Sequence, residues 1–184
     1  MRAMRRSEKE ITDKSEILEV LKRNNVIVLG LHDGDYPYVI AYNYGFEDTE
    51  DGVYLYFHGA NEGQTPDLLR ADARVGFMIY HEYEIEIGKT VCGSTTHFES
   101  ICGTGTVEFI HDAESLERAL RVLIRQCGDM RMDNFHAERF TKMAVYRLKV
   151  KELACKEANV KSSAMYQNWA NRTVGNDGNQ TATE

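Results

Sequence analysis

The sequence lacks any long hydrophobic run, and no stretch approaches the roughly 20 consecutive apolar residues of a membrane-spanning helix. It also lacks an excess of basic residues, because 22 Lys and Arg face 29 Asp and Glu and give a formal net charge of −7. Binding to nucleic acid or to an anionic membrane surface requires many Lys and Arg side chains, so neither partner is expected. The basic start of the chain is followed by charged rather than apolar residues, which excludes a signal peptide pattern. We therefore expect a cytoplasmic protein with a small-molecule or protein partner.

Paired cysteines and metal motifs are also missing. The four cysteines are widely spaced and form no C-x-x-C, so the sequence contains neither a redox pair nor a zinc ligand pattern. We interpret them as free thiols. The six histidines show no metal-ligand spacing, and we predict no metal site. No glycine fingerprint for a resident nicotinamide nucleotide is visible.

The chain is long enough to bury one hydrophobic core. Its 184 residues and 42% hydrophobic content do not require a second domain. We predict one globular domain over residues 1–160 and a polar tail over residues 161–184 that is partly disordered. Met165, Tyr166 and Trp169 either form one docking turn in that tail or belong to a loosely attached segment.

Hydrophobic periodicity predicts five or six strands with helices between them. Residues 13–23 form an amphipathic helix capped by Thr12 or Asp13, and a second amphipathic helix follows residue 110. The segment 82–96 is polar and contains glycine, which predicts a long connection. The strand segments are residues 26–31, 36–44, 53–58, 75–80, 98–110 and 143–150. Consecutive hairpins with peripheral helices are typical of a small antiparallel β-barrel.

The most informative segment is residues 53–70, where an aromatic strand ends in His58 and runs into a helix. Thr65 is a candidate N-cap, Pro66 fits the first helical position, and Asp67 lies in the first turn. The unpaired backbone N–H groups of such a helix start can bind a phosphate. The same residues are also simply a good helix start, and this alternative remains open.

Several motifs in the same order resemble one known family. The motifs are RR at 5–6 with EITD at 10–13, DYPYVIAYNYG at 35–45, YFHGA at 56–60, FESICGTG at 98–105 and VYRLKV at 145–150. From about Arg5 to Lys156 the chain resembles the FMN-binding split-barrel proteins related to pyridoxamine 5'-phosphate oxidase, in the nitroimidazole-resistance (Nim-type) branch. That resemblance implies a six-stranded antiparallel split barrel that dimerises and binds FMN in grooves between subunits.

The resemblance also implies which residues form the cofactor site. The strand that carries Val39, Ile40, Ala41 and Asn43 would lie along the isoalloxazine ring. The end of the next strand would line the ring edge and the sugar-like chain of the flavin, and the turn after it would hold the phosphate. Ser100, from the second subunit or an adjacent strand, would complete the pocket. The strand end and the turn comprise His58, Gly59, Ala60, Gly63, Gln64 and Thr65.

The phosphate turn departs from the pattern of many relatives, which carry Arg or Lys there. Gln64 and Thr65 occupy these positions. A charge-assisted hydrogen bond contributes about 1.5 to 3 kcal/mol, so a basic residue from elsewhere would have to replace it. The candidates are Arg5, Arg6, Arg70 and Arg74.

His58 has two interpretations. It is either a half-buried, hydrogen-bonded residue without special chemistry, or the residue that faces the flavin and donates a proton to a bound substrate, as its place in the family implies. The tyrosines of the neighbouring strands are first of all packing residues, and one or two of them could stack on a planar ligand.

Three functions are consistent with these observations. The resemblance favours an FMN-dependent oxidoreductase that passes electrons from a reduced nicotinamide through the flavin to a small acceptor such as a nitroaromatic compound. A non-catalytic flavin- or haem-binding protein on the same scaffold is the alternative. A ligand-free dimeric interaction module is the third.

Overall fold

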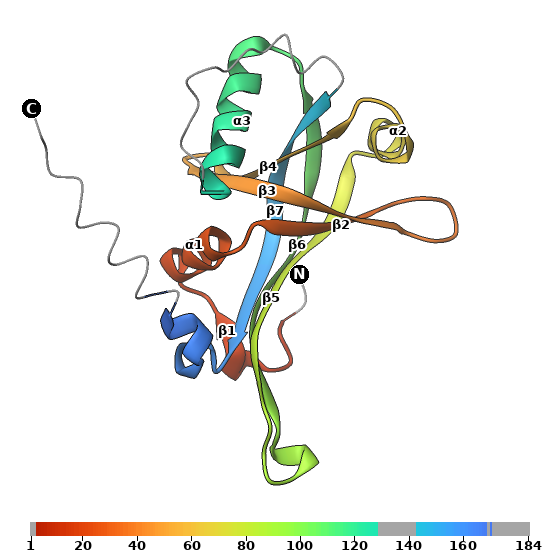
Figure 1. Cartoon of the computed structure of the whole chain (residues 1–184). Helices are drawn as coiled ribbons and strands as arrows, with labels where there is room; N and C mark the ends of the chain where they lie inside the picture. The colour runs from red at the N-terminus through yellow and green to blue at the C-terminus, as the bar shows by residue number, and fades with distance from the viewer. Residues whose placement is uncertain (1–2, 129–142, 169, 171–184) are drawn as a thin grey trace, which may run out of the picture.

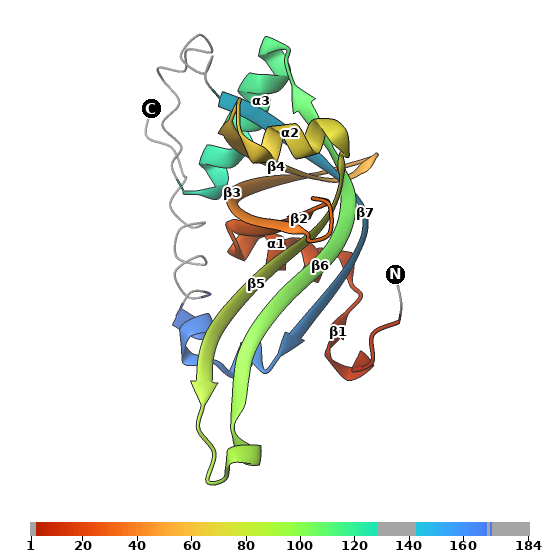
Figure 2. The same ribbon diagram turned by 90° about the vertical axis from the view of Figure 1, so that its right-hand side faces the viewer.

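The computed structural model describes residues 3–128, 143–168 and 170. A strand or a group of consecutive strands follows each helix along the chain (Figures 1 and 2). The helices are α1 (Lys14–Arg23), α2 (Gln64–Ala71) and α3 (Ala113–Gln126), with 3-10 turns η1 (Ser7–Lys9), η2 (Val91–Gly93) and η4 (Val160–Ser162). The strands are β1 (Glu10–Ile11), β2 (Val26–Leu31), β3 (Tyr38–Thr49), β4 (Gly52–Ala60), β5 (Arg74–Glu86), β6 (Thr95–Ile110) and β7 (Met143–Ala158).

The seven strands of the described residues form one sheet with the order β1-β7-β4-β3-β2-β5-β6, and β6 also pairs with β7. Six strands therefore close into a ring, and the two-residue β1 pairs with β7 outside it. Every printed strand pair is antiparallel. The predicted six-stranded antiparallel split barrel with peripheral helices is confirmed.

Alternation along the strands separates an inner face from an outer face. On β5, Val75, Phe77 and Ile79 are buried and point inward, while the intervening residues are exposed. α3 covers the outer face of β3, β4 and β7. Gly45 permits this contact, because a Cβ there would lie only 2.6 Å from the Val122 carbonyl oxygen.

The predicted helix over residues 13–23 and the strand over 26–31 are confirmed. Of the two candidate caps, Asp13 is the N-cap, and its carboxylate accepts a hydrogen bond from the Glu16 N–H at 3.1 Å. β7 continues to Ala158, eight residues beyond the predicted end, because it pairs with β6 along that whole length.

The predicted long connection over residues 82–96 is shorter in the structure. β5 continues to Glu86 and β6 starts at Thr95, so residues 87–94 alone form the connection, at the tip of a two-stranded arm that projects beyond the barrel (Figures 1 and 2). A β-bulge between Glu82 and Glu84 turns Tyr83 inward, where it is buried. Charged residues obscured the strand pattern, because this ribbon is solvated on both faces and needs no apolar alternation.

Part of the predicted tail is ordered against the barrel. The Arg23 guanidinium lies 5.3 Å from the centre of the Tyr166 ring, and that ring meets Tyr83 edge-on at 5.8 Å. Met165 is exposed, and Trp169 and residues 171–184 lie outside the described residues.

The cysteines are free thiols, of which Cys155 is buried and the other three are exposed. Within the part of the chain that the structure describes, no helix is long and apolar enough to cross a membrane.

Candidate functional site

The site predicted from the sequence lies where β3 and β4 separate. Residues 38–43 of β3 pair with β2, whereas residues 44–49 pair with β4. Beyond Phe57, the partner of Tyr44, β4 pairs only with β7 and leads into α2. Val39, Ala41 and Asn43 are exposed on the outer face of β3, and Ile40 packs partly buried against the core. The backbone of this strand is therefore accessible from outside the barrel.

The start of α2 differs from the prediction. Gly63, with φ of 116°, is the N-cap and makes no side-chain capping bond, so Thr65 is not the cap and Pro66 is the third helical residue. Proline fits any position of a first turn, because the N–H groups there have no helical partner, and its presence does not define the first position. Thr65 is instead buried, and its Oγ1 accepts a hydrogen bond from the Tyr42 hydroxyl at 3.0 Å.

The turn is held to its surroundings by polar contacts. Gln64 Nε2 donates to Asp33 Oδ2 at 2.7 Å and ties the turn to the loop between β2 and β3. The first backbone bond of α2 runs from the Asp67 N–H to the Gly63 carbonyl, so the N–H groups of Gln64 and Thr65 lie outside the helical ladder. These two groups are available to an anion.

Arg70 brings positive charge to this turn. Its Nη2 donates to the Asn61 carbonyl at 3.2 Å and its Nη1 to Asp67 at 3.1 Å, and its guanidinium lies 5.2 Å from the centre of the Phe109 ring. Among the four candidate arginines, Arg70 is the one whose guanidinium bonds to the turn within the described residues. Of the four, Arg70 is therefore the arginine that the structure places at the turn.

Aromatic rings form a closely packed wall behind the turn. The Tyr42 and Phe57 ring centres are 5.2 Å apart, and Phe57 stacks on Tyr146 at 4.9 Å. A Cβ on Gly59 would lie 3.2 Å from Tyr42 Cε1, so only a small residue fits at this position. Burial raises the pKa of Tyr42 and raises the pKa of Tyr146 to about 12, so both rings stay protonated hydrogen-bond donors at neutral pH.

His58 lies on the outer face of β4, beside the point where β3 separates. Phe57 and Tyr44 are the last pair of β3 and β4, and His58 is the first β4 residue beyond it. Desolvation lowers the pKa of His58, which keeps the imidazole neutral at pH 7. No hydrogen bond to His58 is seen within residues 3–128 and 143–168, so its ring is available to a ligand.

Ser100 is buried, and its Oγ has no hydrogen-bond partner among the described residues. It lies on β6, separated from β3 by β2 and β5, which places it about 14 Å from the β3 residues at a strand spacing near 4.8 Å. The structure thus brings the β3, β4 and α2 residues together and does not bring Ser100 to them within one protomer.

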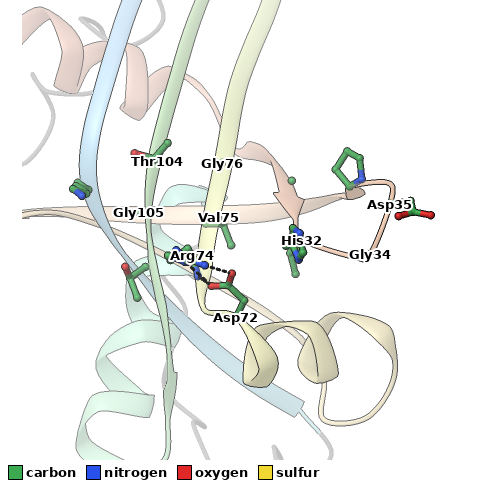
Figure 3. Close-up of a pocket in the computed structure, with 14 residues that line it drawn as sticks. His32, Gly34, Asp35, Asp72, Arg74, Val75, Gly76, Thr104 and Gly105 are labelled. Carbon is green, nitrogen blue, oxygen red and sulfur yellow. Dashed lines mark hydrogen bonds and ion pairs between the residues drawn. The ribbon is translucent and has the colours of Figure 1, made fainter. Parts of the chain in front are cut away.

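A surface cleft of about 770 Å³ lies beside this site and includes none of the predicted cofactor residues (Figure 3). Its floor contains Gly30 and Gly76, which pair across β2 and β5, and Gly30 also pairs with Val39. At its rim, Arg74 bonds Asp72 through Nε at 2.9 Å and Nη2 at 2.7 Å. These bonds hold the pKa of Asp72 well below its usual range. Sequence reasoning missed this cleft, although two glycines at outward strand positions were a visible signal.

Comparison with known families and structures agrees with the family and the fold predicted from the sequence. The family model described as "Pyridoxamine 5'-phosphate oxidase" matches residues 13–157. None of the curated proteins matches the chain at a significant level.

Similar solved structures include a candidate 5-nitroimidazole antibiotic resistance protein from Bacteroides thetaiotaomicron VPI-5482, with 24% identity and a TM-score of 0.68 over 80% of this chain and 86% of that chain. The flavocytochrome Anf3 from Azotobacter vinelandii is 21% identical, with a TM-score of 0.67 over 85% of this chain and 72% of that one. The FAD and heme binding protein from Mycobacterium smegmatis is 18% identical, with a TM-score of 0.67 over 82% of this chain and 73% of that one. At these identities the likeness is one of fold.

Proposed function

Because the chain belongs to the pyridoxamine 5'-phosphate oxidase family, we propose that it is a homodimeric FMN-dependent oxidoreductase that passes electrons from a reduced nicotinamide to a small acceptor such as a nitroaromatic compound. The observation that carries this proposal is the junction of β3, β4 and α2, where exposed backbone, small residues, free helix N–H groups and Arg70 converge. The similarity to the candidate 5-nitroimidazole resistance protein supports the choice of acceptor.

The residues present fit a phosphorylated flavin. The N–H groups of Gln64 and Thr65 and the guanidinium of Arg70 would hold the phosphate at the start of α2. The outer backbone of β3 from Val39 to Asn43, through Ile40 and Ala41, would support the ring, and Gly59 and Ala60 leave room beside it.

FMN, when bound, supplies the hydride and electron chemistry of the reaction. The role of the protein is then to orient the ring, exclude water and supply a proton. His58, exposed where β3 and β4 separate, is the candidate proton donor at the substrate. Because burial keeps most of the imidazole neutral at pH 7, the donor is its protonated fraction, which grows as the pH falls. The orphaned hydroxyl of Ser100 supports a homodimer, because in a site between two subunits a Ser100 from the partner subunit could reach the flavin.

Visible absorbance of the purified protein tests the proposal first. We expect flavin bands, tighter binding of FMN than of FAD, bleaching by NADH or NADPH, and reoxidation by a nitroimidazole. A colourless protein that does not bind added FMN would contradict the proposal. Flavin that binds tightly but is never reduced by NADH or NADPH would exclude the oxidoreductase function.

The substitution His58→Ala tests the proton donor separately. We expect reduction of the acceptor to slow more than flavin binding weakens, because the imidazole acts on the substrate. Equal losses in the rate of acceptor reduction and in flavin affinity would assign His58 a structural role.

A second candidate is a non-catalytic flavin- or haem-binding protein. It is favoured by the similarity in fold to a flavocytochrome and to an FAD and heme binding protein. A Soret band in the same absorbance spectrum would support this alternative over the first.

A further inference from the structure

The arm of β5 and β6 is joined to the segment after β7 through the side chain of His97. Phe98 pairs with Ala158, the last residue of β7, so His97 is the first β6 residue in the part of the arm that has two strands only (Figure 2). The His97 side chain is 5% exposed. Its Nδ1 lies 2.7 Å from the backbone carbonyl oxygen of Asn159, and its Nε2 lies 3.1 Å from the carboxylate of Glu86, the last residue of β5.

Both oxygen atoms can only accept hydrogen bonds, so each contact requires an N–H on the imidazole. A neutral imidazole has one N–H, and its other nitrogen presents a lone pair. The Ser162 hydroxyl lies 3.5 Å from Nδ1, but it donates to the same Asn159 carbonyl at 2.8 Å. The two hydrogen bonds of His97 therefore coexist only when the ring is an imidazolium.

The carboxylates of β5 favour the imidazolium. Glu84 is the register partner of His97, and Glu86 accepts its hydrogen bond. The hydrogen bond to the Asn159 carbonyl raises the pKa of His97 most, burial opposes this rise, and the two glutamates add to it.

The other charged side chains of the elements around His97 have partners of their own. On β6, the buried Glu99 carboxylate pairs with Arg23 at 2.7 Å. On η4, Lys161 pairs with Glu16 of α1 at 3.5 Å. The ionic contact of the imidazole is thus the one with β5.

The Asn159 carbonyl also holds the segment after β7 in place. Asn159 has φ of 53° and is the N-cap of η4, and its carbonyl accepts from the Ser162 N–H at 3.2 Å. This segment continues to Tyr166, whose ring lies 5.3 Å from the Arg23 guanidinium. His97 therefore connects the arm to the segment that covers the buried ion pair.

We propose that His97 is a proton-operated clamp between the arm and the segment after β7. The imidazolium donates to Asn159 and Glu86 at once and holds the arm. When the ring loses its proton, Nδ1–H keeps the shorter bond to Asn159, and the lone pair of Nε2 faces the Glu86 carboxylate. The Glu86 side chain, which is 63% exposed, then turns to solvent and releases the arm.

The direction of the pH dependence follows from the two bonds. Because the folded chain holds the His97 proton more tightly than the unfolded chain, the folded-state pKa lies above the unfolded value of about 6.5. The clamp is fully closed below pH 6.5 or so, and it opens as the pH rises through the folded-state pKa.

Histidine ¹⁵N NMR of the full-length protein tests the protonation state. We expect both ring nitrogens of His97 to carry a proton at pH 6 and its titration midpoint to lie above about 6.5, with the signal assigned by its loss in His97→Gln. Glu86→Gln should lower the midpoint, because it removes the bonded carboxylate. Glu82→Gln is the matched control, since Glu82 lies on the same arm but contacts the Tyr80 hydroxyl, and it should leave the midpoint nearly unchanged.

Hydrogen–deuterium exchange, corrected for the intrinsic rate at each pH, tests the release of the arm. Protection of residues 84–97 should fall about two- to fivefold from pH 6 to pH 8.5, the size expected for a partly exposed ion pair. In Glu86→Gln the protection should be equal at both pH values. Its amide oxygen accepts from an imidazolium and its NH₂ group donates to a neutral ring, so a bond exists in either state.

Three results would each overturn the inference: a neutral His97 at pH 6, arm protection that does not change with pH, or a Glu86→Gln variant with the pH dependence of the wild type. Because the Glu86 side chain is largely exposed, its substitution leaves the core intact. Neither measurement involves flavin. A colourless protein with this pH pattern would reject the proposed function and keep the clamp, and a yellow, active protein without the pattern would do the reverse.

Discussion

Glu99 and Ser100 are neighbours on β6 that point to opposite sides of the sheet, and their surroundings differ completely. The Glu99 carboxylate is fully buried inside the barrel and accepts hydrogen bonds from Arg23 at 2.7 Å, from Asn24 at 2.7 Å and from Tyr83 at 2.8 Å. The Ser100 hydroxyl is buried on the outer side and has no partner among the described residues.

The difference in hydrogen bonding distinguishes a region that stabilises the fold from a region that is available for binding. Buried polar groups are nearly always hydrogen-bonded, and a saturated carboxylate can bind nothing further. The contacts of Glu99 join α1, β5 and β6, and Tyr166 covers Arg23 from the C-terminal segment. An unsatisfied hydroxyl costs free energy in the isolated chain, and a ligand or a second subunit would recover that cost. We therefore expect substitutions in the first region to affect unfolding and substitutions in the second to affect binding.

The largest effect is expected for Arg23→Ala. Removal of the cation leaves Glu99 buried without its counter-charge, which should lower the free energy of unfolding by about 3 to 5 kcal/mol in urea denaturation. Arg118→Ala is the control, because Arg118 pairs with Glu47 at a similar distance of 2.9 Å on the surface, and exposed pairs contribute about 1 kcal/mol or less. Equal losses from the two variants would contradict a structural role for the buried network.

Arg70→Ala should leave stability nearly unchanged and weaken FMN binding. The lost charge-assisted hydrogen bond corresponds to about 1.5 to 3 kcal/mol, or roughly 10- to 150-fold in dissociation constant. Fluorescence titration with riboflavin, which lacks the phosphate, should show no change. Arg121→Ala, a surface arginine paired with Glu117 on α3, is the control and should change neither titration. A matched loss of FMN and riboflavin binding would show that Arg70 does not act on the phosphate.

Ser100→Ala should not destabilise the unliganded chain, because no hydrogen bond within it is lost. Flavin binding should weaken by about 0.5 to 1.5 kcal/mol, or roughly 2- to 10-fold, the contribution of one neutral hydrogen bond. Ser163→Ala offers the contrast, because the buried Ser163 Oγ accepts from the Tyr166 N–H at 3.5 Å and its loss should lower the melting temperature. A lower melting temperature for Ser100→Ala would show that its hydroxyl is already bonded within the chain.

The smallest effect concerns His58 and pH. Desolvation lowers its folded-state pKa below the unfolded value of about 6.5, so between these two values the unfolded chain binds more protons. Stability should therefore fall as pH drops through 6.5 towards the folded pKa, and this contribution should be absent in His58→Gln. Melting temperatures of both proteins from pH 8 to pH 5 measure the difference. Parallel curves would mean that burial does not perturb His58.

Patterns of a few neighbouring residues correctly predicted the features that depend on neighbouring residues alone. Asp13 caps α1 because its carboxylate reaches the third N–H after it, and the apolar run at 26–31 forms β2, in which Ile27, Leu29 and Leu31 are buried. The arm of β5 and β6 was missed because a solvated ribbon carries no hydrophobic alternation. Thr65 was misassigned as a cap because a buried hydroxyl that bonds Tyr42 and a capping hydroxyl look alike in sequence.

The sequence alone determined the barrel, its helices and the segments that meet at the junction of β3, β4 and α2, because hydrophobic periodicity and capping residues act over a few positions. Only the tertiary structure decided that Arg70 contacts the turn and that Ser100 lies three strands from β3 with no hydrogen-bond partner among the described residues. These relations join residues far apart in sequence through strand register and sheet closure, which no local pattern encodes.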